Sequence, residues 1–428
     1  MSNTTKERFL ENDRGEKFRL LKLCWMMYVL FPFRLNGIST LQNLIYYGLS
    51  IVFVCIFFFQ LNKRKVEGKY LSKVIGYLFI LAIITIFAYV VPIVKNTNDT
   101  SYFSYFLYYW GRIIVLTGTL TLCQTVIRYL DLVIDAINLY VMCSIFLLIP
   151  SFHNFYAGVI SVSSTTSAER LEQLYSQTYY TRFGLQGFSG FGATLMCTIS
   201  VLLSCYLIVI SINKKKSMKP YVFRVVISLI GTALYGRIGF LVSLVLIAMT
   251  LLYVAIFYNK YGMLLSICGV GILVIILFVA NAQTLRQISS INWMFEGFFN
   301  YLDSGKFSTK SSTVLMSMFF HPSSQTILFG DGYYTVMGKY YMSTDIGFLR
   351  PLLFFGIFVE FLYYLQILPL LKAIYGRLKN LNASFLVISV TVLLVLFEFK
   401  GESLMTVGNM LFVITLAVVL KSRISSQF

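Results

Sequence analysis

An arginine that stands between two long apolar runs is the most informative candidate for chemistry in this chain. Arg237 occurs in Tyr235-Gly-Arg-Ile-Gly-Phe240. A charged side chain inside a membrane costs free energy. Such an arginine therefore either extends its guanidinium to the membrane interface or binds an anion. Its planar guanidinium fits phosphate oxygens, and the flanking glycines let other groups approach closely. Arg237 is therefore either a helix-end arginine or a phosphate contact.

A second charged pair precedes another long apolar run, in Ser343-Thr-Asp-Ile-Gly-Phe-Leu-Arg350. Asp345 could cap the N-terminus of the helix that follows, or it could act as a general base. Arg350 lies near the positive end of the same predicted helix, where the dipole disfavours a cation. We therefore expect an anionic partner for Arg350, either Asp345 or a ligand.

Two long polar segments, at about 151–189 and 281–345, hold the other candidates. These are Arg170, Arg182, Arg286, Lys306, Lys310 and Lys339, with His321 as a further titratable group. Each could be a solvated loop charge, but together they give a surplus of cations that suits an anionic substrate. A charged turn with Glu398, Lys400 and Glu402 is either solvated or pairs with these cations.

The composition indicates that membrane helices position these residues. Hydrophobic residues make up 58% of the 428 positions and charged residues 12%, which a water-soluble fold could not accommodate. Apolar runs long enough for a bilayer predict about twelve transmembrane helices in one polytopic domain over residues 1–428. They lie near 20–34, 38–60, 74–94, 111–127, 132–150, 190–212, 221–236, 238–258, 262–280, 346–370, 383–398 and 404–420. We expect an all-α integral membrane protein.

Positive charge predicts the orientation. With the N-terminal tail, residues 1–19, in the cytoplasm, the cytoplasmic segments hold 23 of the 35 lysines and arginines. Both termini are then cytoplasmic, and the two long polar segments become outer, periplasmic loops. In the first loop, the capping-box pattern Thr166-Ser-Ala-Glu169 predicts an amphipathic helix lying on the outer membrane face.

Several classes of function are excluded by what the sequence lacks. The net charge of +18 is divided into clusters at helix ends, which argues for contact with membrane lipid and against nucleic-acid binding. The seven cysteines lie within or beside apolar runs without metal-ligand spacing. There is no phosphate-binding glycine loop of the known types. We expect no metal and no cofactor, and a substrate that is already activated and carried in the membrane.

Three segments resemble motifs of the Wzy-type polymerases of bacterial O antigen and capsule, and more distantly those of the O-antigen ligases. The Tyr235–Phe240 segment is similar to a family Arg motif. The second loop has His321-Pro322 followed by Leu328-Phe-Gly-Asp-Gly332, and then Thr344-Asp-Ile-Gly-Phe-Leu349 with Gly356. The ligases carry His-Asn where this chain has Asp345-Ile346, which favours a polymerase. Arg286 and Gly297 are similar to an Arg-Gly motif of some members.

The resemblance implies a fold like that of the GT-C glycosyltransferases and a substrate of oligosaccharide repeats linked through pyrophosphate to undecaprenol. Glycosyl transfer would be metal-independent and would take place at the bacterial inner membrane, with a chain-length regulator as a further partner. Asp345, with His321 as second choice, is the expected catalytic base. The expected glycan and pyrophosphate contacts are Arg237, Arg286, Arg350, Lys310, Arg170 and Arg182. A flippase of lipid-linked oligosaccharide and an O-antigen ligase are the alternatives.

Overall fold

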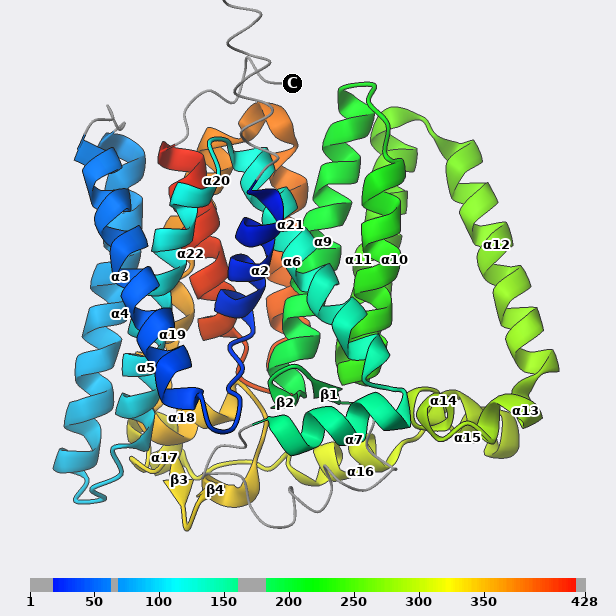
Figure 1. The fold of residues 1–428 in the computed structure, drawn as a ribbon. Helices are drawn as coiled ribbons and strands as arrows, with labels where there is room; N and C mark the ends of the chain where they lie inside the picture. The colour runs from blue at the N-terminus through cyan, green and yellow to red at the C-terminus, as the bar shows by residue number, and fades with distance from the viewer. Residues whose placement is uncertain (1–17, 63–67, 161–181, 421–428) are drawn as a thin grey trace, which may run out of the picture.

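The computed structural model describes residues 18–62, 68–160 and 182–420. Figure 1 shows a bundle of upright helices whose lower end is covered by short horizontal helices. The upright helices are α2 (Arg19–Leu30), α3 (Ser39–Asn62), α4 (Gly68–Val94), α5 (Ser101–Thr119), α6 (Val126–Phe146), α9 (Phe191–Asn213), α10 (Lys219–Tyr235), α11 (Arg237–Tyr258), α12 (Tyr261–Ala280), α19 (Ile357–Leu365), α20 (Leu368–Arg377), α21 (Ala383–Glu398) and α22 (Leu404–Leu420).

The covered end, which we name the loop face, carries the remaining elements. They are α7 (Pro150–Val159), α13 (Ala282–Arg286), α14 (Ser289–Met294), α15 (Glu296–Ser304), α16 (Lys310–Ser317), α17 (Ser324–Phe329), α18 (Leu349–Phe355) and the hairpins β1 (Phe183–Gly184) to β2 (Gly187–Phe188) and β3 (Thr335–Val336) to β4 (Lys339–Tyr340). Three 3₁₀ turns, η1 (Leu120–Leu122), η3 (Tyr341–Ser343) and η4 (Lys379–Leu381), complete the described elements.

The helices identify an all-α membrane protein. Six helical segments in the described part of the chain are long and apolar enough to cross a membrane: Ser39–Leu61, Gly68–Val94, Val126–Phe146, Phe191–Asn213, Arg237–Tyr258 and Ile357–Arg377. Shorter apolar helices, such as α21 and α22, stand beside them. Many of the outward-facing side chains on these helices are large and apolar, as expected where lipid is the solvent.

Each of the twelve segments expected to be helical contains a helix, but several expectations about their extent are wrong. Helices α4 and α6 each begin six residues before the predicted start. Helix α5 begins at Ser101, ten residues before the predicted start. The single helix expected over 346–370 is divided into α18 and α19 at Gly356, and α20 begins only at Leu368. The break at Gly356 occurs because its φ of 78° lies in the left-handed region, which favours glycine.

Gly330 and Gly356 make a close crossing of two backbone segments, which explains their place in the motifs. Both have positive φ angles, and a Cβ atom on Gly356 would stand 2.5 Å from the Leu328 carbonyl oxygen. The Asp331 amide donates to the Leu353 carbonyl at 2.7 Å beside this crossing. The Leu328–Gly332 motif therefore has a structural role in seating the second loop on α18.

Asp99 fixes the same loop from the other side. Its carboxylate accepts hydrogen bonds from the amides of Tyr334 at 2.6 Å and Thr335 at 2.8 Å, and from Ser101. Burial alone would raise the pKa of Asp99, but these hydrogen bonds lower it below its ordinary value. The connection between α4 and α5 thus anchors the β3–β4 region.

Helix α9 forms the centre of the green half of the bundle in Figure 1 and packs against α6, α10, α11 and α21. Its Thr194 hydroxyl contacts the Gly236 carbonyl at 3.1 Å, and a Cβ atom on Gly236 would lie 3.0 Å from the Thr194 side chain. The glycines beside Arg237 therefore permit a close approach, as expected from the sequence. The group that approaches is a threonine of the neighbouring helix.

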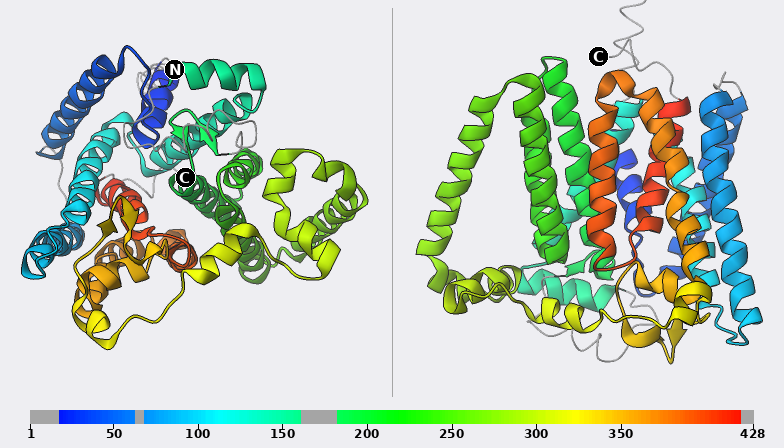
Figure 2. Two further views of the ribbon diagram at one scale, coloured as in Figure 1. Left: turned by 90° about the horizontal axis from the view of Figure 1, so that it is seen from below. Right: turned by 180° about the vertical axis from the view of Figure 1, so that it is seen from behind.

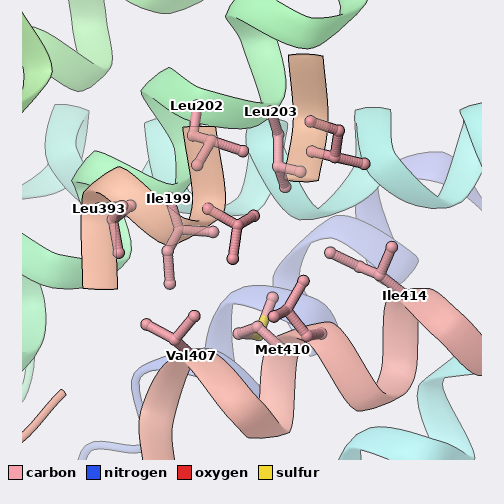
Figure 3. Close-up of a pocket in the computed structure, with 10 residues that line it drawn as sticks. Ile199, Leu202, Leu203, Leu393, Val407, Met410 and Ile414 are labelled. Atoms are coloured by element: carbon pink, nitrogen blue, oxygen red, sulfur yellow. The ribbon is translucent and has the colours of Figure 1, made fainter. Parts of the chain in front are cut away.

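A small pocket lies inside the bundle, between α9, α21 and α22. Figure 3 shows its apolar lining, with Ile199 and Leu202 from α9, Leu393 from α21, and Val407 and Met410 from α22. Its volume is about 20 Å³, little more than a single water requires. Because its lining offers no polar group, this pocket is a packing defect of the core and is not a site for the candidate residues.

Candidate functional site

Arg237 begins α11 at the loop face. Helix α10 ends at Tyr235, and the single extended residue Gly236 joins it to α11. The positive end of the α11 dipole adds to the guanidinium charge, and such helix ends attract anions. The sequence expectation that Arg237 stands at the end of a tight helical hairpin is confirmed.

Two residues of the second loop contact the Arg237 side chain. Its Nη2 atom lies 2.5 Å from the Glu296 carboxylate, and its guanidinium lies 4.8 Å from the ring centre of Trp293. The Nε and Nη1 atoms of Arg237 are buried and have no hydrogen-bond partner among the described residues. Since a buried guanidinium gains from every donor that is satisfied, these two atoms offer donors to a further anionic group.

Arg182 approaches the same tryptophan from the first loop. Its guanidinium lies 4.8 Å from the Trp293 ring centre. Its backbone is held by a hydrogen bond from its amide to the Leu234 carbonyl at the end of α10, and by one from the Ser189 amide to its own carbonyl. Two arginines from segments about 50 residues apart are thereby gathered around one indole ring.

The charged turn between α21 and α22 completes this group. The charges of Asp345 and Arg182 both act on the Lys400 ammonium, and the turn is joined to the Asp345 segment by the hydrogen bond from the Gly347 amide to the Glu398 carbonyl. The Phe191 side chain, at the start of α9, lies against Gly401 of this turn. We name Arg182, Arg237, Trp293, Glu296, Asp345 and Lys400 the loop-face cluster.

Asp345 does not cap a helix, so that interpretation is wrong. Helix α18 begins at Leu349 with Phe348 at the N-cap position and without a side-chain cap. Gly347 instead donates its amide to the Glu398 carbonyl at 2.8 Å, and a Cβ atom there would lie 2.5 Å from the Gly401 carbonyl oxygen. The glycine of the Asp-Ile-Gly motif therefore lets the charged turn reach Asp345, whose half-buried carboxylate is left for other contacts.

The partner of Arg350 is Glu402, at 3.6 Å, and neither Asp345 nor a ligand is needed. The same carboxylate accepts hydrogen bonds from three buried tyrosine hydroxyls, of Tyr102, Tyr334 and Tyr363. The guanidinium of Arg350 also lies over the rings of Tyr334 and Tyr340. This buried pair joins α5, α18 and α19 and has a structural role, although the sequence suggested a secondary phosphate contact for Arg350.

The other expected site residues lie apart from the cluster or are only indirectly linked to it. Arg286 donates to Asp303 at 2.8 Å and to the Phe299 carbonyl, and so ties α13 to α15. His321 is exposed. The Lys310 side chain is exposed, while its backbone amide donates to Glu296 at 3.0 Å. Arg170 and the amphipathic helix expected near 166–178 lie outside the described residues.

Trp293, Glu296 and Lys400 were not chosen from the sequence as ligand contacts. Trp293 is one of only three tryptophans, and Glu296 follows it by about one helical turn, so an aromatic–acid pair in a polar loop was the available signal. Trp293 and Glu296 lie 56 and 59 residues after Arg237 in the sequence, so their contact with Arg237 could not be foreseen. Within the described residues, no group of three or more His, Cys, Asp or Glu side chains could hold a metal ion.

The reduced basicity of Lys400 gives a testable dependence on pH. Burial lowers the pKa of Lys400, Asp345 raises it, and Arg182 lowers it, with a net result below the ordinary value. As pH rises through this lowered pKa the ammonium charge is lost, so sulfate binding should weaken at a lower pH than for an exposed lysine. Titration calorimetry with sulfate, whose charge is constant over this range, measures the effect. Lys400→Arg, which stays charged, should abolish the alkaline loss; an unchanged pH profile in this variant would contradict the assignment.

The loop-face cluster thus combines three cations, one aromatic ring and two carboxylates at the end of a membrane bundle. Such a set can bind a polyanionic group next to a general base. A comparison of the chain with family models, with curated proteins and with solved structures finds no match in any of the three.

Proposed function

We propose that this protein polymerises oligosaccharide repeats linked through pyrophosphate to undecaprenol, producing O antigen or capsule. One observation carries the proposal: Arg237 and Arg182 meet at Trp293, and the charge of Arg182, like that of Asp345, acts on Lys400. A lipid pyrophosphate needs positive charge around its oxygens, and the acceptor hydroxyl needs a carboxylate within reach. The resemblance of residues 235–356 to Wzy-type polymerases supports the same assignment.

In the proposed reaction, the hydroxyl oxygen of the acceptor repeat forms a bond to the anomeric carbon of the donor. The bond between that carbon and the pyrophosphate oxygen breaks, and undecaprenyl pyrophosphate leaves with the electron pair. The hydroxyl proton passes to the Asp345 carboxylate. Arg237, Arg182 and Lys400 stabilise the negative charge that develops on the leaving group, and a preorganised set of cations does this at low reorganisation cost.

The proposal includes an orientation in the bacterial inner membrane. We assign the loop face to the periplasm and both termini to the cytoplasm, with twelve spans and a GT-C-like arrangement. Lys214–Lys216 connect α9 to α10 at the end opposite the loop face (Figure 1), and positive residues are concentrated on the cytoplasmic side of membrane proteins. The cluster would then face the leaflet in which finished lipid-linked repeats are displayed.

The decisive test supplies purified protein in bilayer nanodiscs with a synthetic undecaprenyl-pyrophosphate-linked repeat. We expect a ladder of products that differ by one repeat, and we expect the same ladder in the presence of a chelator because arginine and lysine supply the charge. A product that remains a single repeat would refute polymerisation. In cells, deletion of the gene should leave single-repeat glycolipid at the surface; repeats trapped on the cytoplasmic leaflet would indicate a flippase.

A further inference from the structure

Glu296 makes two contacts that join the phosphate side of the cluster to a surface helix. One carboxylate oxygen, Oε2, contacts Arg237 at 2.5 Å. The other, Oε1, accepts a hydrogen bond at 3.0 Å from the amide of Lys310, the first residue of α16. A single side chain therefore binds the proposed pyrophosphate contact and the N-terminus of α16 together.

The other end of α16 contacts Thr344 and the backbone of Asp345, the proposed base. Met318, directly after α16, receives the Asp345 amide on its sulfur at 3.5 Å, and its carbonyl accepts from the Thr344 hydroxyl at 3.4 Å. Figure 2, in the view from below, shows this yellow helix crossing between the green helices and the orange ones. Helix α16 thus extends from Arg237 to Asp345.

The described contacts hold α16 mainly at its two ends. None of its eight residues is buried, and Val314 and Met316 are among its exposed apolar side chains. The capping box of Thr309 and Ser312 acts within the helix and does not attach it to the bundle. Because a helix of this length is unstable in isolation, loss of the Glu296 contact should loosen it.

We propose that Glu296 is a positioning residue through which binding of an anion at Arg237 uncovers Asp345. A pyrophosphate that takes the Arg237 guanidinium competes with Glu296, which then no longer fixes the Lys310 amide, and α16 moves away from Thr344 and Asp345. The acceptor hydroxyl can reach the base only after the donor has bound. This order protects the donor from attack by water. The inference rests on the proposed pyrophosphate site.

Two variants separate competition from helix attachment. Glu296→Gln removes the charge that competes for Arg237. Lys310→Pro removes the amide that Glu296 binds, and proline is favoured at the first position of a helix. The preceding Thr309 already has the extended backbone (φ −135°, ψ 156°) that precedes proline. Asp303→Asn is the matched control, because it breaks the similar pair with Arg286, which lies outside the cluster.

The experiment measures binding of inorganic pyrophosphate by titration calorimetry and amide hydrogen exchange of residues 310–317 by mass spectrometry, on the full chain in nanodiscs. In the unaltered protein, pyrophosphate should accelerate exchange of this peptide. Glu296→Gln should bind pyrophosphate about tenfold more tightly, but its amide oxygen can still accept from the Lys310 amide, so exchange without pyrophosphate should stay slow. Lys310→Pro should exchange fast without pyrophosphate, with a smaller gain in affinity, because binding and undocking are linked. Asp303→Asn should behave like the unaltered protein.

The outcomes distinguish this inference from the proposed function. Absence of pyrophosphate binding by the unaltered protein would remove the anion site, and the function with it. Binding that leaves exchange of 310–317 unchanged, or a Glu296→Gln variant that binds pyrophosphate more weakly, would overturn only the role of Glu296. Weaker binding is the result expected if Glu296 merely orients Arg237.

Discussion

Arg237→Ala is expected to abolish polymer formation while the protein still accumulates in the membrane. The side chain contributes one ion pair and one ring contact at the loop face, so its removal leaves the helix packing intact. Loss of one preorganised charge at the leaving group should lower the rate of chain extension by about 100- to 1000-fold. Arg237→Lys keeps the charge without the planar donors and should be intermediate. The measurement is the rate of ladder growth with purified protein.

Arg286→Ala is the matched control for this prediction. Arg286 also belongs to the loop face and also pairs with an acid, Asp303, but the described contacts do not connect it with Trp293 or Lys400. Its replacement should change the extension rate by less than about threefold, because exposed ion pairs contribute little. Equal losses in the two variants would mean that the loop-face cluster has been assigned to the wrong arginine.

Glu402→Ala should have the largest effect on stability. It would leave the buried guanidinium of Arg350 without its carboxylate and would remove the acceptor of three tyrosine hydroxyls. Breaking one partner of a buried pair costs roughly 3–5 kcal/mol. We expect little folded protein in the membrane, measured as detergent-extracted monodisperse material and as the midpoint of thermal unfolding.

The double variant Arg350→Met with Glu402→Leu tests the reason for that loss. Replacing both charges by apolar groups of similar size is often neutral, so the pair of substitutions should restore the part of the folded protein that was lost to the unpaired charge. The part lost to the three tyrosine hydroxyls without an acceptor should remain. A single Glu402→Ala variant that folds normally but makes no polymer would contradict the structural role. Glu402 would then have to be moved into the catalytic group.

The helical segments could be predicted because each contains an apolar run in the sequence, and six of them in the described part of the chain are long and apolar enough to cross a membrane. The positions at which a helix is interrupted were harder to predict. The division at Gly356 depends on the backbone of Leu328, which crosses it from the second loop, and no local pattern reports such a crossing. The early start of α5 has a similar cause, since Tyr102 packs on Tyr334 of the second loop and on Phe354 of α18.

The site was predicted in part. Arg237, Arg182 and Asp345 were chosen for their chemistry, and the structure places them in one region, although their roles stay predictions. The choice between partners could not be made from the sequence: Arg350 pairs with Glu402, 52 residues away, while the nearer Asp345 stands beside Lys400. Long-range contacts decide which charges neutralise each other, and the sequence records only that the charges exist.

Helix α12 stands apart from the rest of the bundle (Figure 1), and nearly all of those of its side chains that the structure describes are exposed. Its 20 residues span about 30 Å, the hydrocarbon thickness of a typical bilayer. At its lower end, Phe278 packs on Phe295 at 4.7 Å between ring centres, and Phe295 precedes Glu296. A thinner bilayer would tilt α12 and displace Phe295, the residue before Glu296. The thickness of the bilayer would then change the distance between the Glu296 carboxylate and Arg237.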